Sequence, residues 1–415
     1  MIDAGSSGTR AHIYQWDSSD EFPNVQPVSE GGKPCFIKIK IPIAKSAKNM
    51  TLIPVIFNQI ISFCIKHIPP AYLPKTRIFV YATAGMRLLT DLEQEMVIGT
   101  TYRYLIKSSP FKVKPNYIRI ISGIEEGIYG WLSVNHLLGN FVHKNPTVGA
   151  LDMGGASFQV ALEVSDQQSP VHTVTIGDKR INIYAHSYLG YGANEALKSI
   201  TRSLYAVFGS SGKPFEHPCY NNGYNGSYHG ISFVGTGDFG KCSTFIQEIL
   251  LQASPFSSVE IPSLEKTNSF VAMASFYYIN SFFNLTAASS LDELKDKSQE
   301  FCKKNWNDLS KTYGNDEYVL TYCFASVYQW NMLAEGLGFQ ERKTKVAKHD
   351  DINGVDLSWT IGAMLSQAGE IEIDEKPALM FPVLILANVI SFLVLLPVFI
   401  IHERKRMTPS RFAVM

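Results

Sequence analysis

Two short stretches of the chain share one order of residues: an apolar run, a single aspartate and a loop of small residues. They are MIDAGSSGTR at residues 1–10 and GALDMGGASFQ at residues 149–159. Glycine permits positive φ angles and close approach of the main chain to a ligand, and successive N–H groups in such a turn form a concave anion site. A segment that alternates apolar and polar residues follows each loop, as in a half-buried strand. The chain therefore contains two predicted strand–turn–strand units.

The chemistry of the two turns predicts a phosphate site that includes a metal ion. Hydroxyl groups suited to phosphate oxygens are present in both, at Ser6, Ser7, Thr9 and Ser157. An aspartate beside a phosphate is repelled unless a cation lies between them, so Asp3 and Asp152 predict a hydrated divalent metal. An Asx turn between two strands accounts for either motif alone, but the pair favours the metal–phosphate interpretation.

The remaining pattern predicts an α/β protein. The chain has 415 residues, which exceeds the length that a single hydrophobic core usually supports. We therefore expect two globular units. Alternating strands and helices indicate sheets with helices on their faces. We expect buried strands that run into glycine turns at 76–85, 117–127 and 231–240, helices at 51–68, 268–284 and 321–338, and a loop at 217–230.

Residues 379–401 form the longest apolar stretch, 23 residues without a formal charge. As a helix this stretch is long enough to cross a hydrocarbon layer of about 30 Å. Basic residues follow it and acidic residues precede it, which by the positive-inside rule places a tail at 402–415 in the cytoplasm. Everything before the span is then lumenal or extracellular. Residues 1–20 contain no signal peptide or membrane segment, so we expect that upstream sequence is missing.

Other features agree with an oxidising compartment. Three N-x-[ST] sequons lie at Asn49, Asn225 and Asn284. Six cysteines suit three local disulfides, although spacing alone leaves their connectivity open; free buried thiols are the alternative, and zinc-type spacing is absent. Lys plus Arg and Asp plus Glu both total 37, so no overall charge attracts nucleic acid or acidic lipid.

A hydrolytic centre also needs a group that activates water. The segment SGIEEGIYGW places Glu125 and Glu126 in a predicted turn at the end of a strand, where either could act as a general base. Gln159 lies two residues beyond Ser157 on the same side of its strand and could orient a water.

A second phosphate signature supplies the alternative function. GTGDFG at 235–240 matches the G-x-G-x-x-G of dinucleotide-binding turns and follows a predicted strand, with Glu260 20 residues beyond its last glycine. Cys242 follows almost at once and is expected to form a disulfide, which argues against this interpretation. The segment GSSGKPF at 209–215 has the wrong spacing for a P-loop.

Taken together, these motifs resemble those of the ectonucleoside triphosphate diphosphohydrolases, the apyrase family within the actin/heat-shock/sugar-kinase superfamily. Five family regions appear in order, at 2–10, 81–89, 121–139, 150–161 and 357–365. The resemblance implies a two-lobed, duplicated ribonuclease-H-like fold with an acidic phosphate loop from each lobe facing a nucleotide cleft. Residues 1–122 with 350–375 then form the first lobe, and 123–349 the second.

The resemblance also implies roles for individual residues. Glu126, rather than Glu125, is the general base, and Ser157 and Gln159 position the attacking water. Asp3 and Asp152 hold Ca²⁺ or Mg²⁺ largely through waters, with Thr83 nearby. The remaining implied residues are phosphate-binding Ser6, Ser7, Gly8, Thr9, Gly154, Gly155 and Ala156, base-binding Tyr278 and Tyr322, Trp359 near the cleft, and the disulfides Cys35–Cys64, Cys219–Cys242 and Cys302–Cys323. Phe158 departs from the family's usual threonine.

The implied activity is metal-dependent hydrolysis of the terminal phosphate of nucleoside tri- and diphosphates such as UDP, GDP and ATP. The expected location is the Golgi membrane with the catalytic domain in the lumen; the plasma membrane and the lysosomal membrane are alternatives. Two other functions stay open, a membrane-anchored nucleotide-binding protein with weakened catalysis and a dinucleotide-binding oxidoreductase. The interpretation leaves room for a homo-oligomer.

Overall fold

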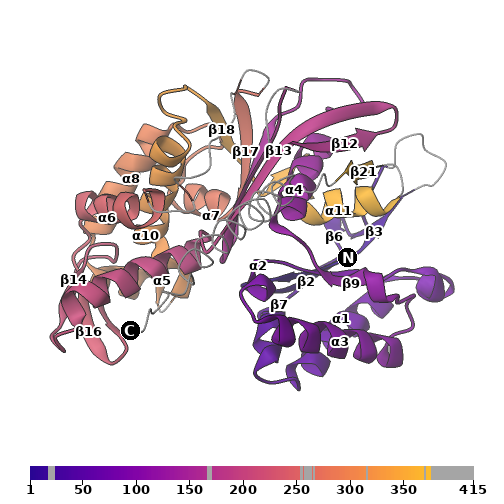
Figure 1. Cartoon of the computed structure of the whole chain (residues 1–415), viewed down its shortest axis with the longest axis horizontal. Coiled ribbons are helices and arrows are strands. Elements are labelled where there is room, and N and C mark those ends of the chain that lie inside the picture. Colours follow the sequence, from indigo (N-terminus) through magenta and orange to yellow (C-terminus); the bar gives the residue numbers. More distant parts are fainter. Residues whose placement is uncertain are drawn as a thin grey trace, which may run out of the picture. The chain divides into compact units, whose positions relative to one another are not determined.

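The first sheet contains both strands of the N-terminal acidic motif. The computed structural model describes residues 1–16, 24–165, 171–252, 256, 264, 267–314, 316–368 and 371–374 (Figure 1). The strand order is β7-β2-β1-β8-β9, with bounds β1 Ile2–Gly5, β2 Gly8–His12, β7 Phe36–Ile39, β8 Val80–Ala82 and β9 Ile118–Ile120. Strands β1 and β2 form an antiparallel hairpin, and β1 also pairs in parallel with β8. The strand–turn–strand prediction is confirmed for this motif.

Helices α1 (Leu52–His67) and α3 (Asp91–Ser108) pack side by side next to this sheet (Figure 1). The buried residues of α1 recur at helical spacing and face the core, as an amphipathic helix requires; they are Ile53, Ile56, Phe57, Ile60 and Ile61. The predicted helix at 51–68 is therefore confirmed. The short helix α2 (Ala84–Arg87) follows β8 directly.

The second sheet has seven strands and includes the second acidic motif. Its order is β18-β17-β10-β11-β13-β12-β21, with bounds β10 Gly149–Met153, β11 Ser157–Glu163, β12 His172–Ile176, β13 Lys179–Leu189, β17 Ser269–Ala274, β18 Lys345–Lys348 and β21 Ile371–Asp374. Strands β10 and β11 form the second predicted hairpin. Strand β21, which belongs to the range 350–375, lies at the edge of this second sheet. With helices packed on both sheets, the predicted α/β class is confirmed.

Strand alternation decides which side chains of β11 face the site. Phe158, Val160 and Leu162 belong to the core on one face, which they share with the helices of the second half of the chain. Ser157 and Gln159 lie on the opposite face, toward helix α4 (Gly123–Leu137). Phe158, which departs from the usual threonine, is therefore a fully buried core residue.

Helix α4 packs against both the second sheet and helix α11 (Trp359–Ala368) (Figure 1). One hydrophobic cluster joins these two helices to the first sheet. The other helices of the second half are α5 Ala193–Leu204, α6 Phe239–Ile246, α7 Ser275–Phe282, α8 Leu291–Lys303, α9 Trp306–Tyr313 and α10 Glu317–Asn331. A small sheet with order β14-β16-β15 lies among them, with β14 Phe215–His217, β15 Asn225–Tyr228 and β16 Ile231–Gly235.

Shorter elements complete the described chain. The two-stranded pairs are β3 Tyr14–Gln15 with β4 Gln26–Pro27, β5 Ser29–Glu30 with β6 Lys33–Pro34, and β19 Asp351–Ile352 with β20 Val355–Asp356. The 3₁₀ turns are Ile43–Ala47, Pro70–Lys75 and Pro115–Tyr117, and wider π turns extend α5, α6 and α10 at Tyr205–Gly209, Gln247–Leu251 and Met332–Gly336.

Three predictions of secondary structure were wrong in part. Residues 268–284 are a strand followed by a helix, because residues 269–274, which include Phe270 and Val271, pair with β10 in the sheet. The predicted loop at 217–230 contains β15 and the end of β14. The predicted turn around Glu125 and Glu126 is instead the first turn of α4, which begins with a capping box between Ser122 and Glu125.

Two of the three predicted disulfides are present in the structure and the third is absent. Disulfides Cys219–Cys242 and Cys302–Cys323 are present as expected. The predicted Cys35–Cys64 bridge is wrong, since both are free thiols. The Cys35 sulfur lies beside the Glu30 carboxylate and the His67 imidazole, which are bonded to each other at 2.7 Å. Burial raises the pKa of both thiols, which keeps them protonated.

The structure describes the glycosylation sequons but not the predicted membrane span. Of the helices in the described ranges, none is long and apolar enough to cross a membrane. The predicted span at 379–401 and tail at 402–415 lie outside the described residues. Asn49, Asn225 and Asn284 are all exposed, so each sequon is accessible to glycosylation.

Candidate active site

The two acidic hairpins have matching registers. In the first, Asp3 lies opposite Arg10, and in the second, Asp152 lies opposite Gln159. The turns come close together, since a methyl group added to Gly155 would lie 2.9 Å from the Ser6 Oγ. The fold therefore brings together two phosphate-loop candidates that are far apart in the sequence.

A pocket of about 300 Å³ lies at this meeting point. It is lined by three buried or half-buried carboxylates, Asp3, Glu126 and Asp152. The two loops contribute Gly5, Ser6, Ser7, Gly154, Gly155, Ala156 and Ser157. Thr83 lines it as well, from the position just before α2, and is 4% exposed. The pocket thus combines small-residue loops with a concentration of negative charge.

Glu126 lines this pocket and is 7% exposed. Burial raises the pKa of Glu126, and the guanidinium of Arg87 acts against that rise. Arg87 Nη2 lies 2.7 Å from Glu126 Oε2, while Arg87 Nη1 donates to the Ile121 carbonyl at 2.9 Å. Arg87 therefore holds Glu126 in position and favours its ionised form.

Glu126 is linked to the second hairpin through Gln159. The Gln159 amide donates to Glu126 Oε2 at 3.2 Å, to Ser157 Oγ at 2.6 Å and to Ser187 Oγ at 2.9 Å. Arg87 Nη2 also donates to Ser157 Oγ at 3.3 Å. Glu126, Ser157 and Gln159 therefore form one hydrogen-bonded group, the arrangement that orienting a water beside a general base requires.

Asp3 has one satisfied and one unsatisfied oxygen. Its Oδ2 pairs with Arg10 Nη1 at 3.1 Å, but its buried Oδ1 has no hydrogen-bond partner among the described residues. Burial raises the pKa of Asp3, and Arg10 acts against that rise. A buried carboxylate oxygen without a partner is costly unless a ligand satisfies it.

Asp152 shows that the pocket concentrates negative charge. Burial, together with the nearby Glu126 and Asp3, raises the pKa of Asp152 to about 7. Oxygen donors of this kind are the ligands that Ca²⁺ and Mg²⁺ prefer. The donor set and the unsatisfied Asp3 Oδ1 fit a divalent cation, for which Asp3 and Asp152 are the candidate ligands.

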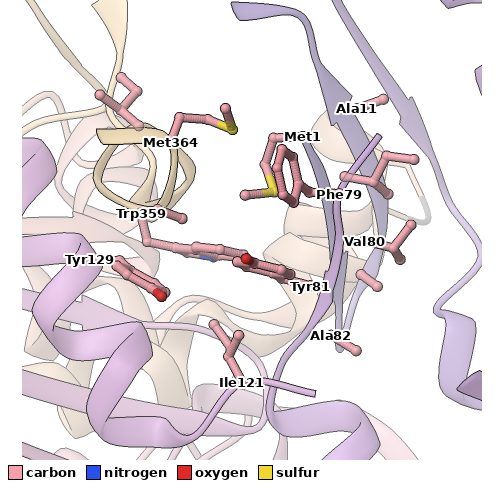
Figure 2. Packing of buried hydrophobic residues seen from close by; sticks show 14 of the residues in the cluster. Met1, Ala11, Phe79, Val80, Tyr81, Ala82, Ile121, Tyr129, Trp359 and Met364 are labelled. Carbon is pink, nitrogen blue, oxygen red and sulfur yellow. The ribbon is translucent and has the colours of Figure 1, made fainter. Parts of the chain in front are cut away.

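Aromatic side chains line the pocket on its other sides. Tyr278 in the middle of α7 lines the pocket and is 58% exposed. Trp359 lines the pocket at the start of α11 and stacks on Tyr129 with ring centroids 6.3 Å apart. Figure 2 shows Trp359 beside Tyr129, in the hydrophobic cluster that also contains Tyr81. Tyr322 does not line the pocket; its ring packs on Phe282 at 4.7 Å.

Two residues predicted to bind phosphate lie outside the pocket lining. The Thr9 hydroxyl is buried and donates to the Ile41 carbonyl at 2.9 Å. A methyl group on Gly8 would lie 2.7 Å from the Ile39 carbonyl oxygen. Both residues therefore contact the chain at and just after β7 rather than the pocket. Successive side chains of a strand point to opposite faces, so Thr9 points away from the face that carries Arg10.

Several polar residues in or next to this site were not selected from the sequence. Arg10 and Arg87 lie inside the quoted family regions 2–10 and 81–89, so their charge beside those motifs was an available signal. Ser187 had no such signal, because only the pairing of β13 with β11 brings it to Gln159. Asp350, just before β19, and Asp356, in β20, also line the pocket.

The G-x-G-x-x-G segment has a structural explanation. Gly237 has φ +58°, and a methyl group there would lie 1.9 Å from the Cys302 carbonyl oxygen. A methyl group on Gly235 would lie 2.2 Å from the Asn221 carbonyl oxygen. Cys242 is bonded to Cys219, as anticipated, and Glu260 lies outside the described residues. Neighbouring backbone occupies the space that a pyrophosphate would need, which argues against a dinucleotide site.

Comparisons with known proteins agree with this geometry. The profile of the GDA1/CD39 (nucleoside phosphatase) family matches residues 1–379. The chain is 30% identical to mouse ectonucleoside triphosphate diphosphohydrolase 3 over 421 residues, covering 89% of this chain and 78% of that protein. It is 32% identical to probable apyrase 3 of Arabidopsis thaliana over 400 residues, covering 88% and 81%.

Solved structures support the fold. A nucleoside triphosphate hydrolase structure from Neospora caninum superposes with a TM-score of 0.63 at 15% identity, covering 88% of this chain and 91% of that one. An exopolyphosphatase-like protein gives 0.53 at 10% identity, covering 88% and 97%. The family profile and the relatives' names make the chain a nucleotide phosphohydrolase of the apyrase class. The protein with these two facing acidic loops belongs to the GDA1/CD39 nucleoside phosphatase family.

Proposed function

We propose that the chain removes the terminal phosphate of nucleoside di- and triphosphates, with Glu126 as the general base. The observation that carries this proposal is the hydrogen-bonded group of Glu126, Ser157 and Gln159 beside the two phosphate loops. UDP, GDP and ATP are the proposed substrates.

The chemistry of the step follows from these positions. The Ser157 hydroxyl and the Gln159 amide orient a water next to Glu126, and the Glu126 carboxylate accepts a proton from it. The water oxygen attacks the terminal phosphorus in line, the bond to the bridging oxygen breaks, and that oxygen leaves with the remaining nucleotide. Main-chain N–H groups of the loops at Ser6 and Gly155 stabilise charge on the phosphate oxygens.

Asp3 and Asp152 would hold a divalent cation, Ca²⁺ or Mg²⁺, largely through waters, with Thr83 next to it. When bound, this cation neutralises the phosphates and stabilises the charge that develops on them. The pocket lining supports the assignment, because it contains Asp3, Glu126 and Asp152 and would repel a bare polyphosphate.

Tyr278 provides a stacking surface for the base, and Tyr322 contributes beside it. Burial raises the pKa of Tyr322, and the nearby Asp316, Tyr318 and Tyr278 act in the same direction. Stacking tolerates several bases, which fits broad nucleotide use.

We further propose a Golgi location with this site in the lumen. The two disulfides and the three exposed sequons support a secretory route. The apolar segment at 379–401 would be the membrane anchor.

The decisive experiment replaces the Glu126 carboxylate by an amide of the same shape, which cannot act as a general base. Glu126→Gln is expected to fold and to bind nucleotide, yet release phosphate from UDP at least about a thousandfold more slowly. Glu125→Gln is the matched control, because Glu125 pairs with Arg119 at 2.7 Å and caps α4 rather than lining the pocket. Malachite-green assays of both variants, with and without EDTA, test base and cation together. Near-normal turnover by Glu126→Gln would remove the mechanism.

A further inference from the structure

Arg10 is the one cationic side chain among the described residues that line the pocket. The pocket also contains His12, but burial lowers the pKa of His12 to about 3, so it carries no charge at neutral pH. A ligand with several phosphates would therefore meet a single positive side chain of the protein within the pocket.

The guanidinium of Arg10 joins the two functional parts of the first hairpin. Its Nη1 lies 3.1 Å from Asp3 Oδ2, and its Nη2 donates to Ser7 Oγ at 2.9 Å. Gly5 makes this position accessible, since a methyl group on Gly5 would lie 2.8 Å from Arg10 Nη1. Arg10 thus contacts a candidate cation ligand and a candidate phosphate ligand at the same time.

The sheet places Arg10 between opposite charges. In the strand register, Asp3 on β1 is its neighbour on one side and Lys38 on β7 is its neighbour on the other. Lys38 is exposed, and repulsion from Arg10 is among the causes that lower the pKa of Lys38. When Asp3 no longer attracts Arg10, repulsion from Lys38 disfavours a move toward β7 and leaves the pocket as the favourable direction.

We propose that Arg10 competes with the divalent cation for Asp3 and, once displaced, binds the nucleotide phosphates. A cation and a guanidinium beside one carboxylate repel each other, so occupancy of Asp3 by one disfavours the other. The planar fork of arginine then matches phosphate oxygens, and Ser7 already lies within its reach. This inference rests on the proposed function for the identity of the ligand.

If Arg10 competes with the cation for Asp3, removing Arg10 should change the affinities for the cation and for the nucleotide in opposite directions. Without Arg10, the cation alone binds Asp3 more easily, because no competing cation has to leave. The nucleotide binds less well, because a phosphate contact is lost. A residue that only stabilised the hairpin would weaken both ligands together.

The test uses Arg10→Met, with Lys38→Met as the matched control that removes the same charge from the neighbouring strand. Mn²⁺ binding is measured by electron paramagnetic resonance without nucleotide, and a non-hydrolysable UDP analogue by calorimetry at saturating Mg²⁺. For Arg10→Met we expect Mn²⁺ affinity to rise about tenfold and analogue affinity to fall about tenfold. For Lys38→Met we expect both affinities to change by less than about threefold.

A second variant keeps the test informative if Arg10→Met does not fold. Arg10→Lys preserves the charge but cannot bridge Asp3 and Ser7 with one planar group, so we expect shifts in the same directions of about threefold. Unchanged or weaker Mn²⁺ binding in a folded Arg10 variant overturns the competition, as does equal behaviour of Arg10→Met and Lys38→Met. Neither binding measurement requires turnover. Absence of phosphate release by the wild-type chain would therefore contradict the proposed function without deciding this inference.

Discussion

Arg87 and Glu126 form a partly buried ion pair with a 2.7 Å contact, although they come from different elements and lie 39 residues apart. Arg87 ends the short helix α2 next to the first sheet, and Glu126 lies in the first turn of α4 next to the second. The side chain that tunes the proposed base thus comes from the other half of the molecule.

Arg87→Met is expected to shift the pH dependence of the reaction. Burial and the Asp3 charge raise the pKa of Glu126, and Arg87 acts against them. Without Arg87 the pKa of Glu126 rises further, so the ionised fraction of the base falls at a given pH and recovers at higher pH. We expect the acid limb of the kcat/KM profile to move upward by about one pH unit or more. Arg119→Met, which removes the same charge beside Glu125, should leave that limb in place.

Asp152→Asn should change how stability depends on pH when no cation is present. Burial and the nearby Glu126 and Asp3 raise the pKa of Asp152 in the folded chain to about 7, from an ordinary value of about 3.8. A carboxyl with a raised folded pKa contributes stability below its unfolded pKa and loses that contribution as the pH rises through the folded pKa. In EDTA the wild-type Tm should therefore fall between about pH 4 and pH 7 relative to the variant. At pH 8 the variant should be more stable, and added Ca²⁺ should stabilise the wild type more. A wild-type Tm that rises relative to the variant over this window would contradict the prediction.

Thiol titration distinguishes the free cysteines from the expected third bridge. With Cys35 and Cys64 free, unfolding in guanidinium without reductant should expose two reactive thiols per chain. After reduction the number should be six. A count of zero thiols before reduction would show that Cys35 and Cys64 are bonded to each other.

Replacing Cys302 and Cys323 by alanine should lower the free energy of unfolding by about 3 kcal/mol, because the disulfide no longer restricts the unfolded chain.

Tyr278→Ala is expected to weaken nucleotide binding more than it slows the chemical step. Its ring is 58% exposed in the pocket, so its removal deletes a stacking surface without opening the core. We expect the KM for UDP to rise about tenfold with little change in kcat. Tyr313→Ala removes another exposed tyrosine, one that packs on Phe282 outside the pocket. An equal rise in KM for both variants would count against base stacking.

The parts of the fold that could be predicted depend on short-range rules. Both acidic hairpins followed from alternating strands around small-residue turns, and α1 followed from the spacing of its apolar residues. The hairpins and α1 are visible within a short window of sequence, which is why their patterns were informative. The two disulfides join cysteines 23 and 21 residues apart, but this spacing left their connectivity open, and the pairs followed from the family resemblance.

Features that depend on contacts between residues far apart in the sequence could not be predicted in this way. Residues 269–274 are rich in apolar side chains, and only pairing with β10 makes them a strand rather than part of a helix. Ser187 reaches Gln159 because β13 pairs with β11. Cys35 and Cys64 had a plausible spacing, but whether two sulfurs meet depends on how β7 and α1 pack, which spacing does not report.

By itself the sequence determined the residue types of the site, the two acidic loops and the family to which the chain belongs. Tertiary structure alone decided that Ser6 faces Gly155, that Arg87 pairs with Glu126, and that Thr9 turns away from the pocket. The physical reason is that strand period and turn chemistry act between near neighbours in the chain. The burial that raises the pKa values of Glu126 and Asp152 exists only where the two sheets and α4 enclose them.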